Sequence, residues 1–247
     1  MHAVFFSDAH IRSAQDPHSV RLISWLDNLE VDRIYILGDL FDYWWEYGDY
    51  VPTELQPLFD CLLRITRRGI ELFLLGGNRD FALGTLFRER VGAQVVCAHV
   101  TVLDGICFRL AHGDEADKRI GYMATRIFLR SKPFALLMKL LGPRKGYSLL
   151  KRFAKESRQH MTSQEALVLA QEKWACQQLQ DVDVVVVGHS HRLAEVTFEN
   201  GTLYQLGDWI SLCSYLELKD GALQLCQFTE RSNEGREDHR ADSPHRQ

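Results

Sequence analysis

Residues 71–84, ELFLLGGNRDFALG, carry the signal that decides the fold. Four consecutive apolar residues follow the glutamate, and an uninterrupted run of this kind is typical of a strand covered on both faces of its sheet. Two glycines end the run, and Asn78, Arg79 and Asp80 follow directly. An amide, a guanidinium and a carboxylate at a strand end indicate a ligand-binding turn, because ligands bind beyond the carboxyl edge of the strands in open α/β sheets.

Five further runs of the same kind predict the other central strands. Each is apolar and stops at a small or polar cluster: AVFFSD at 3–8, RIYILGD at 33–39, ICFRLAHGD at 106–114, VDVVVVGHSH at 182–191 and TLYQLGDW at 202–209. Helical patterns occur at 18–29, 53–68 and 82–91. Alternation of such strands and helices predicts an α/β layered architecture for the first half of the chain.

The chain after His189 follows a different pattern. Short strands are expected at 194–198, 203–206, 212–218 and 222–228. Two of the connections contain Asn-Gly and Asp-Gly, which are strong hairpin signals. We therefore predict antiparallel or mixed sheet in this half.

Residues 118–178 carry no strand signal and are predicted to form a helical insertion. Its middle alternates apolar clusters with basic residues and is broken at Lys-Pro and Gly-Pro, which predicts two or three short amphipathic helices. Two interpretations remain open. The insertion is either a cap that buries Leu136, Leu137, Leu140 and Leu141 against the main domain, or a basic lid whose apolar face meets an anionic lipid or a membrane surface.

Composition narrows the class of protein. A length of 247 residues with 46% hydrophobic content suits one large domain that carries an insertion. The net charge of -4 argues against a general nucleic-acid binder, which needs a basic surface. Six cysteines without a CxxC pair are typical of reduced thiols. The beginning, MHAVFFSDAH, lacks the regions of a signal peptide, so we expect a cytoplasmic protein.

Side chains that bind metals stand at the ends of five predicted strands. They are two aspartates, an asparagine and four histidines: Asp8, His10, Asp39, Asn78, His112, His189 and His191. Each is common in turns or cores when taken singly, but five neighbouring strand ends would point all of them at one crevice. Oxygen and imidazole donors without a thiolate suit Mn²⁺, Fe²⁺, Zn²⁺ or Mg²⁺. The sequence therefore predicts a site for divalent cations at this edge.

The spacing of these residues suits two cations. Alternate side chains of an extended segment point to the same side, so Asp8 and His10 can reach one cation while Ala9 faces away. His189 and His191 can be shared between two cations only if the backbone bends between them. Two cations about 3.5–4 Å apart acidify a water and clamp both oxygens of a phosphoryl displacement. The chemistry indicated is hydrolysis of a phosphate ester or anhydride.

The ordered set D-x-H, G-D, G-N, H-G-D and G-H-x-H resembles the calcineurin-like metallophosphoesterase superfamily from residue 1 to about 210. The resemblance implies an α/β sandwich of two mixed β-sheets flanked by helices. It also implies two cations, for which we expect Mn²⁺, and a metal-bridging hydroxide as the nucleophile. The resemblance assigns Asp8, His10, Asp39 and His191 to one cation, and Asp39, Asn78, His112 and His189 to the other.

Within this superfamily, the chain is similar to the UDP-2,3-diacylglucosamine hydrolases of lipid A biosynthesis. The motifs YILGDLFDYW, GNRDFALG, GHSHR and LGDW look like those of that family, and the helical insertion lies where the family has a lid for acyl chains. The resemblance implies cleavage of this nucleotide-sugar lipid to UMP and 2,3-diacylglucosamine 1-phosphate, with peripheral contact at the inner membrane. It also implies that Asn78, Arg79, Asp117 and Lys155 contact the substrate.

The same resemblance implies a metallophosphoesterase domain over residues 1–230, with the insertion at 118–178, and we expect a disordered tail at 231–247. Two segments depart from the family. HGDEADKRIGY after the fourth strand end is one residue shorter, and in FAKESRQHMTS only a Lys-Glu pair aligns.

Arg79 stands where the wider superfamily usually has a histidine that can protonate a leaving group. An arginine, with a pKa above about 12, cannot donate that proton at neutral pH, but it can hold phosphate oxygens bidentately. This exchange favours cleavage of an anhydride over cleavage of an alkyl ester.

Several neighbouring residues have two interpretations. The aromatic residues 43–45 either line a nucleotide or sugar pocket or fill an edge of the core. Arg12 and Asp42 are candidates for orienting the ligands or a phosphate. Asp114 either orients His112 or makes a turn.

Two alternatives to the lipid-precursor hydrolase remain. One is a metallophosphoesterase for another nucleotide-linked or lipid-linked phosphate. The other is a metal-dependent scaffold without turnover, which has less need of Asn78 and His112.

Overall fold

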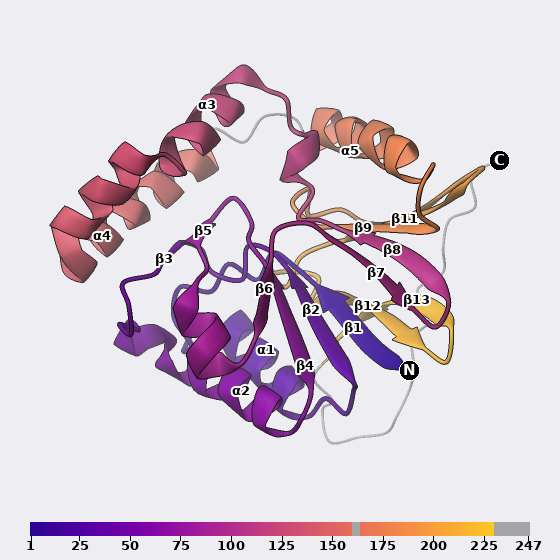
Figure 1. The fold of residues 1–247 in the computed structure, drawn as a ribbon, viewed down its shortest axis with the longest axis horizontal. Coiled ribbons are helices and arrows are strands. Elements are labelled where there is room, and N and C mark those ends of the chain that lie inside the picture. Colours follow the sequence, from indigo (N-terminus) through magenta and orange to yellow (C-terminus); the bar gives the residue numbers. More distant parts are fainter. Residues whose placement is uncertain (160–163, 230–247) are drawn as a thin grey trace.

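The computed structural model describes residues 1–159 and 164–229 of the chain. Two β-sheets face each other at its centre, and helices cover their outer faces (Figure 1). The first sheet has the strand order β13-β12-β1-β2-β4-β6, and the second has the order β10-β11-β9-β8-β7. The predicted α/β sandwich of two mixed sheets is therefore confirmed.

The first sheet is parallel in one half and antiparallel in the other. Its parallel strands are β1 (His2–Phe6), β2 (Arg33–Leu37), β4 (Glu71–Leu75) and β6 (Gln94–Val96). Its antiparallel strands are β12 (Ser214–Lys219) and β13 (Ala222–Gln227). The last four residues of β1, β2 and β4 are all buried, as expected of strands covered on both faces. Asp220 and Gly221 close the β12–β13 hairpin with φ of 52° and 79°, as the Asp-Gly signal predicts.

The second sheet has a parallel centre and antiparallel edges. Its central strands are β8 (Ile106–Leu110), β9 (Val184–Val187) and β11 (Gly201–Leu206). Its edges are β7 (His99–Leu103) and β10 (Leu193–Phe198). Aromatic rings fill the space between the sheets: Phe5 stacks on Tyr35 and on Phe108, with ring centroids 4.9 and 5.7 Å apart. This packing holds the two sheets, and therefore their strand ends, in fixed relation.

Helices α1 (Pro17–Asp27) and α2 (Gln56–Arg67) pack on the outer face of the first sheet (Figure 1). The helix expected at 82–91 is shorter: the short strand β5 (Asp80–Ala82) pairs with β3 (Trp44–Trp45), and a π-helix covers Leu86–Val91. The Glu46 carboxylate accepts hydrogen bonds from the N–H groups of Gly84 and Leu86, at 2.9 and 3.2 Å. These bonds delay the start of the helix, because they hold the residues before it in a turn.

The described residues of the insertion form three helices: α3 (Ile120–Leu129), α4 (Lys132–Gln159) and α5 (Gln164–Gln178). The Gly-Pro break is confirmed as a kink inside α4, where Gly142 has φ 67° and ψ 177°. The Lys-Pro pair instead begins α4, because a proline is tolerated in the first turn of a helix. No strand occurs in the described part of residues 118–178.

Helices α3 and α4 have a small hydrophobic core of their own. Leu129, Phe134, Met138 and Leu150 form it, and the aromatic residues Tyr43, Trp45 and Tyr47 pack against it. The interpretation as a cap that buries four leucines is wrong for Leu136, Leu137 and Leu140, which are 58%, 41% and 77% exposed, whereas Leu141 is partly buried. Helix α4 turns Phe134 and Met138 toward the domain instead, which leaves this leucine face to the solvent.

Two expectations fall outside the described residues. The predicted tail at 231–247 lies outside them, and so does the side chain of Lys155. No helix within the described ranges is long and apolar enough to cross a membrane.

Candidate metal centre

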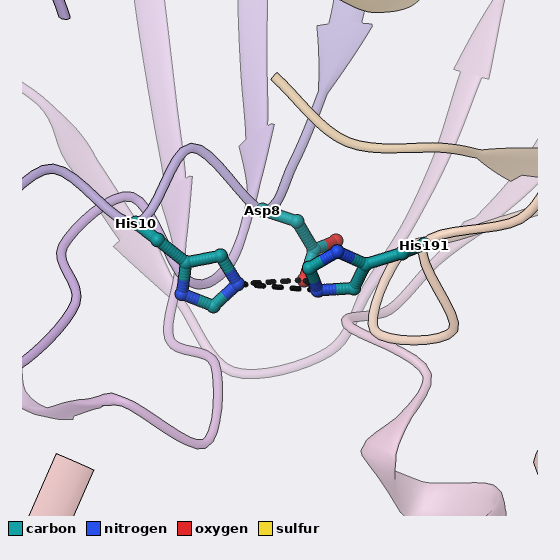
Figure 2. A group of neighbouring side chains, drawn as sticks. All are labelled: Asp8, His10 and His191. Atoms are coloured by element: carbon teal, nitrogen blue, oxygen red, sulfur yellow. Dashed lines mark hydrogen bonds and ion pairs between the residues drawn. The ribbon is translucent and has the colours of Figure 1, made fainter. Parts of the chain in front are cut away.

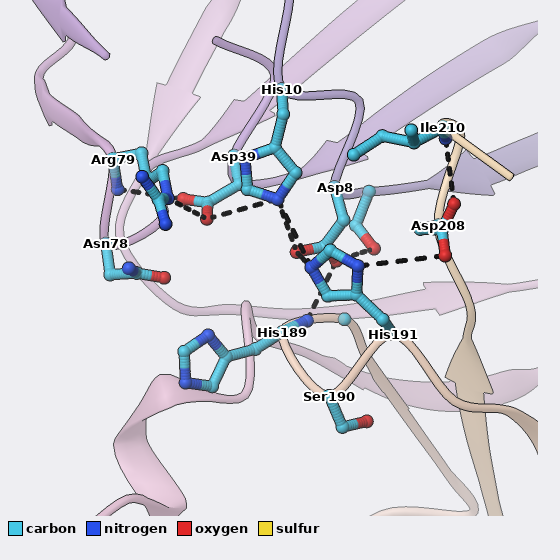
Figure 3. A network of polar contacts seen from close by, with 12 residues as sticks. Asp8, His10, Asp39, Asn78, Arg79, His189, Ser190, His191, Asp208 and Ile210 are labelled. Carbon is cyan, nitrogen blue, oxygen red and sulfur yellow. Dashed lines mark hydrogen bonds and ion pairs between the residues drawn. The ribbon is translucent and has the colours of Figure 1, made fainter. Parts of the chain in front are cut away.

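The seven predicted ligands meet at one edge of the sandwich, in the loops that follow five strands. Figure 3 labels all of them except His112. In the first sheet, Asp8 and His10 follow β1, Asp39 follows β2, and Asn78 follows β4. In the second sheet, His112 follows β8, and His189 and His191 follow β9. Both sheets thus contribute ligands. The predicted convergence of the strand ends is observed.

Five of the seven residues have a left-handed backbone. The angle φ is 55° at Asp8, 46° at His10, 52° at Asp39, 67° at His189 and 54° at His191. Such a conformation in a residue other than glycine costs about 1–3 kcal/mol and persists where the surrounding structure holds it, most often at functional sites. Sharp turns, rather than extended strands, therefore aim these side chains.

The extended geometry predicted for Asp8 and His10 is wrong, because β1 already ends at Phe6. The N–H groups of both residues pair with the loop after β2: Asp8 donates to the Gly38 carbonyl at 3.1 Å, and His10 donates to the Asp39 carbonyl at 2.9 Å. These bonds offset part of the cost of the turn. The bend expected between His189 and His191 is present.

Asp8, His10 and His191 form the first group of ligands (Figure 2). The Nε2 atoms of the two histidines lie 3.2 Å apart, and His191 Nε2 lies 3.4 Å from Asp8 Oδ1. Both imidazole rings thus aim a nitrogen at the same point. This separation fits two nitrogens that each lie about 2.0–2.2 Å from one cation.

Asn78, His112 and His189 form the second group. His112 Nε2 lies 3.1 Å from the Asn78 side-chain oxygen. The rings of His112 and His189 have centroids 5.0 Å apart. The Asn78 oxygen and the His112 imidazole thus lie side by side, and the His189 ring lies next to the His112 ring.

Asp39 lies between the two groups. Its Oδ2 is 3.8 Å from His10 Nε2, and its Oδ1 is 3.6 Å from His112 Nε2. Gly77 makes this approach possible, because a Cβ atom there would lie 2.1 Å from Asp39 Oδ1. One carboxylate therefore faces both groups, as a bridging ligand must.

Two observations indicate that these residues are suited to bind cations. Asp8 Oδ1 and His189 Nε2 are buried polar atoms that have no hydrogen-bond partner among the described residues. Unpaired buried groups of this kind are costly and call for an explanation such as a bound ion. In addition, His10 Nε2 and His191 Nε2 lie 3.2 Å apart, close enough to share a proton or to hold one cation between them.

The electrostatics of the site also favour cations. Burial would lower the pKa of His112, but the charges of Asp39 and Asp8 raise it to about 9. Burial likewise opposes the charge on His191, yet Asp8 and Asp208 raise its pKa to about 10. Burial disfavours ionised Asp8, but the charge of His191 lowers its pKa well below the ordinary value. The site therefore has a strongly negative potential, which a proton or a metal ion can neutralise.

The model of the calcineurin-like phosphoesterase family matches residues 1–193. The chain belongs to this family. It is also similar to two UDP-2,3-diacylglucosamine hydrolases. The one from Porphyromonas gingivalis is 32% identical over 85% of this chain and 91% of that protein. The one from Nitrosococcus oceani is 32% identical over 85% of this chain and 88% of that protein.

These relatives confirm the resemblance that the motifs predicted. Among solved structures, an archaeal phosphodiesterase is similar with a TM-score of 0.45 and 12% identity, over 92% of this chain and 100% of that one. Members of the family use divalent metals, and the described residues of this chain supply the candidate ligands.

The candidate ligands are held by groups behind them, an arrangement that is typical of metal sites. His112 Nδ1 lies 2.8 Å from the Leu37 carbonyl, so this nitrogen carries the proton and leaves Nε2 for a cation. Asp8 Oδ2 accepts hydrogen bonds from the Ser7 hydroxyl at 2.6 Å and from the His189 N–H at 2.8 Å. The latter bond joins the loops after β1 and β9.

Sequence reasoning did not identify Asp208 as part of this site. Its Oδ2 lies 3.7 Å from His191 Nδ1 (Figure 3), and it also accepts hydrogen bonds from the N–H groups of Ile210 and Ser211. Burial would raise the pKa of Asp208, but its contact with His191 lowers the pKa to about 2. The only available signal was the aspartate of LGDW at the end of β11.

Arg79 and Asp80 take opposite directions from the same turn. The Arg79 guanidinium lies 3.5 Å from Asp42 Oδ1 and 3.9 Å from Asp39 Oδ2, so it stands beside the bridging carboxylate. Asp80 instead points into the protein and accepts the N–H groups of Leu40 and Phe41, each at 3.1 Å. It thereby fastens the loop after β2 to the loop after β4.

Arg12 and Asp42 pair with each other, with Arg12 Nε 2.9 Å from Asp42 Oδ2. Asp42 thus contacts both Arg12 and Arg79 and orients their guanidinium groups. Among the aromatic residues after Asp42, Trp44 belongs to the core, and Trp45 packs on Phe134 of α4 with centroids 5.6 Å apart. The interpretation as an edge of the core fits Trp44.

The two aspartates that follow His112 hold different partners. Asp114 accepts a hydrogen bond from the Tyr122 hydroxyl at 2.9 Å and pairs with Arg126 at 3.1 Å, so it anchors α3. Asp117 is buried, pairs with Arg119 and lies 4.0 Å from His189 Nε2. It is therefore within reach of the second group of ligands.

The central position of Asp39 predicts the effect of removing its charge. Asp39→Asn keeps the shape of the side chain, but it deprives both groups of a carboxylate. We expect Mn²⁺ affinity to fall by at least about tenfold at both points, and hydrolysis to fall with it. The measurement is metal content per chain by mass spectrometry after dialysis against dilute Mn²⁺. The matched control is Asp49→Asn, an exposed aspartate outside the site. A variant with undiminished metal would contradict the bridging role.

Proposed function

We propose that this protein hydrolyses the pyrophosphate of UDP-2,3-diacylglucosamine to UMP and 2,3-diacylglucosamine 1-phosphate, as a step of lipid A biosynthesis. The observation that carries the proposal is the pair of ligand groups joined by Asp39, with the Arg79 guanidinium beside that carboxylate. The names and coverage of the similar hydrolases support the choice of substrate.

Asp39 would hold both cations. Asp8, His10 and His191 would complete one site, and Asn78, His112 and His189 would complete the other. Cations bound there would supply an acidified water and a polarised phosphoryl oxygen. Mn²⁺ is the proposed metal, because carboxylate, amide and imidazole donors without a thiolate suit it.

Arg79 would hold the phosphate oxygens as charge develops on them. Its side chain is only 12% exposed, and its contacts with Asp39 and Asp42 fix the plane of the guanidinium. A planar guanidinium can bind two phosphate oxygens at once. It cannot give a proton to the leaving group at neutral pH. This suits a phosphate monoester, which leaves an anhydride without prior protonation.

The lid would bind the acyl chains. Helices α3 and α4 expose several large apolar side chains: Ile120 (86%), Ile127 (67%), Phe128 (51%), Leu136 (58%) and Leu140 (77%). Exposed apolar side chains in such number on two adjacent helices indicate a surface that binds something apolar. Basic residues lie on the same helices, which suits a lipid phosphate or an anionic membrane surface.

The lid also touches the metal loops. Arg130, directly after α3, donates to the Gly77 carbonyl at 3.3 Å. Helix α3 is held by Asp114, two residues after His112. The apolar surface would thus be fixed beside the site of cleavage. Asp117 and Lys155 remain proposed contacts of the substrate head group, and the proposed location is the cytoplasmic face of the inner membrane.

The proposed reaction is tested by the products formed from UDP-2,3-diacylglucosamine with Mn²⁺. We expect UMP and 2,3-diacylglucosamine 1-phosphate in equal amounts, measured by mass spectrometry. In ¹⁸O-labelled water the label shows which phosphate is attacked. Intact substrate, alongside turnover of a chromogenic phosphodiester, would assign the chain to another phosphate ester; inactivity on both would favour a scaffold.

Arg79→Ala should lower kcat/KM for the pyrophosphate by about 10²–10³-fold, because one charged donor to the phosphate oxygens is lost. Metal content should stay at the wild-type level, because a guanidinium is not a ligand. Steady-state kinetics and metal analysis on one preparation separate the two effects. Arg88→Ala, at an exposed arginine of the π-helix, is the control. Unchanged kinetics for Arg79→Ala would remove this residue from the reaction.

Leu136→Glu and Leu140→Glu test the lid. Each should lower kcat/KM for the diacylated substrate by about ten- to hundredfold, because contact of a leucine with an acyl chain is worth about 1.5–3 kcal/mol. Hydrolysis of a small soluble phosphodiester should be unaffected. The control is Val20→Glu, since Val20 of α1 is 50% exposed. Equal losses on both substrates would show that the exposed leucines serve the fold rather than the acyl chains.

A further inference from the structure

A buried amide of the insertion lies directly behind the metal centre. Gln171 of α5 is 0% exposed. Its Nε2 donates to the Gly188 carbonyl at 2.8 Å and to the Gly113 carbonyl at 3.4 Å. One side chain thus joins the loop after β8 to the loop after β9, and it does so from a helix that belongs to neither sheet.

The orientation of this amide is fixed by a third contact. Gln205 of β11 donates from its Nε2 to the Gln171 Oε1 at 2.8 Å. If the Gln171 amide were turned over, its oxygen would face the two carbonyl oxygens, which have no proton to offer. Both N–H bonds of Gln171 therefore point at the loops.

The two carbonyls belong to residues adjacent to metal-ligand candidates. Gly113 follows His112, and Gly188 precedes His189; these two histidines are the imidazoles of the second group. A backbone bond, from the Gly188 N–H to the His112 carbonyl at 2.9 Å, joins the same loops. Gln171 therefore acts on the separation and angle of the two loops that aim these imidazoles.

Helix α5 holds the loop after β9 at a second point. Gln164, at the start of the helix, donates from its Nε2 to the Ser190 carbonyl at 2.7 Å. Ser190 lies between the two histidines with left-handed backbones, whose conformation persists only where neighbours hold it. Two glutamines, seven residues apart on α5, thus bind the carbonyls of Gly188 and Ser190, which lie two residues apart in the loop after β9.

The Gln171 side chain packs closely against Gly113, the residue directly after His112. Gly113 has φ of 100°, and a Cβ atom there would lie 2.5 Å from Gln171 Nε2. The absence of a Cβ atom at Gly113, in the H-G-D motif, thus leaves space for the Gln171 amide and also permits the positive φ of the turn.

We infer that Gln171 is a positioning residue that sets the geometry of His112 and His189 for the second cation, with Gln164 supporting the same loop. The inference rests on the proposed two-cation function. It divides the insertion into two parts: α5 supports the metal loops, whereas α3 and α4 offer the apolar surface.

The test is a calorimetric titration of the metal-free protein with Mn²⁺, together with electron paramagnetic resonance of the loaded protein, in which two bridged Mn²⁺ ions give a coupled signal. Gln171→Leu keeps the volume of the side chain but removes its hydrogen-bond donor. In this variant we expect the affinity for the Mn²⁺ ion of the second group to fall about 10–100-fold, while the other ion binds as in the wild type. At Mn²⁺ concentrations that saturate the wild type, the coupled signal should give way to that of a single ion.

Gln164→Ala removes a donor from an exposed position, so it keeps the inference testable if Gln171→Leu fails to fold; we expect the same selective loss at a smaller size. Gln177→Leu, at an exposed glutamine of α5, is the matched control.

A wild-type protein that binds no Mn²⁺ would contradict the proposed function itself. A wild type with two coupled ions, and folded Gln171→Leu and Gln164→Ala variants with the same two, would overturn only the positioning role. A lowered melting temperature with unchanged metal binding would show a merely structural role and would also overturn it.

Discussion

The carboxylate of Asp39 is the constraint on which the rest of the site depends. It faces an imidazole of each ligand group, and together with Asp8 it creates a negative potential strong enough to raise the pKa of His112 to about 9. Such a cluster is stable only when positive charge enters it. The sandwich brings the strand ends of two sheets together, and left-handed turns then aim the side chains inward. The fold thus concentrates charge that a pair of cations would neutralise.

The turn GGNRDF brings three polar groups together because each has a separate direction and partner. Asn78 faces His112, Arg79 faces Asp39 and Asp42, and Asp80 points back to bind the N–H groups of the loop after β2. The second glycine leaves the space that Asp39 occupies. One turn therefore supplies a candidate ligand, a guanidinium that we propose to bind phosphate, and a structural tie between neighbouring loops.

The sequence was sufficient to predict what depends on local pattern. Apolar runs that end in polar residues predicted the central strands and the meeting of the seven candidate ligands at one edge, because parallel strands carry their carboxyl ends to that edge. Features that depend on distant partners left no such signal. Glu46 shifts the helix start at Leu86, and Gln171 reaches Gly113 across 58 positions of the chain. The apolar pattern of α4 also could not show that Leu140 faces solvent, since either face could have packed.

The proposed roles of these residues all depend on two cations that would lie between the loops and share Asp39. Anomalous X-ray scattering from a crystal of the Mn²⁺-loaded protein, with data on both sides of the manganese edge, tests this arrangement most directly. The account predicts two manganese peaks about 3.5–4 Å apart, with an Asp39 oxygen bound to each. A single peak, or two peaks of which only one contacts Asp39, would contradict it.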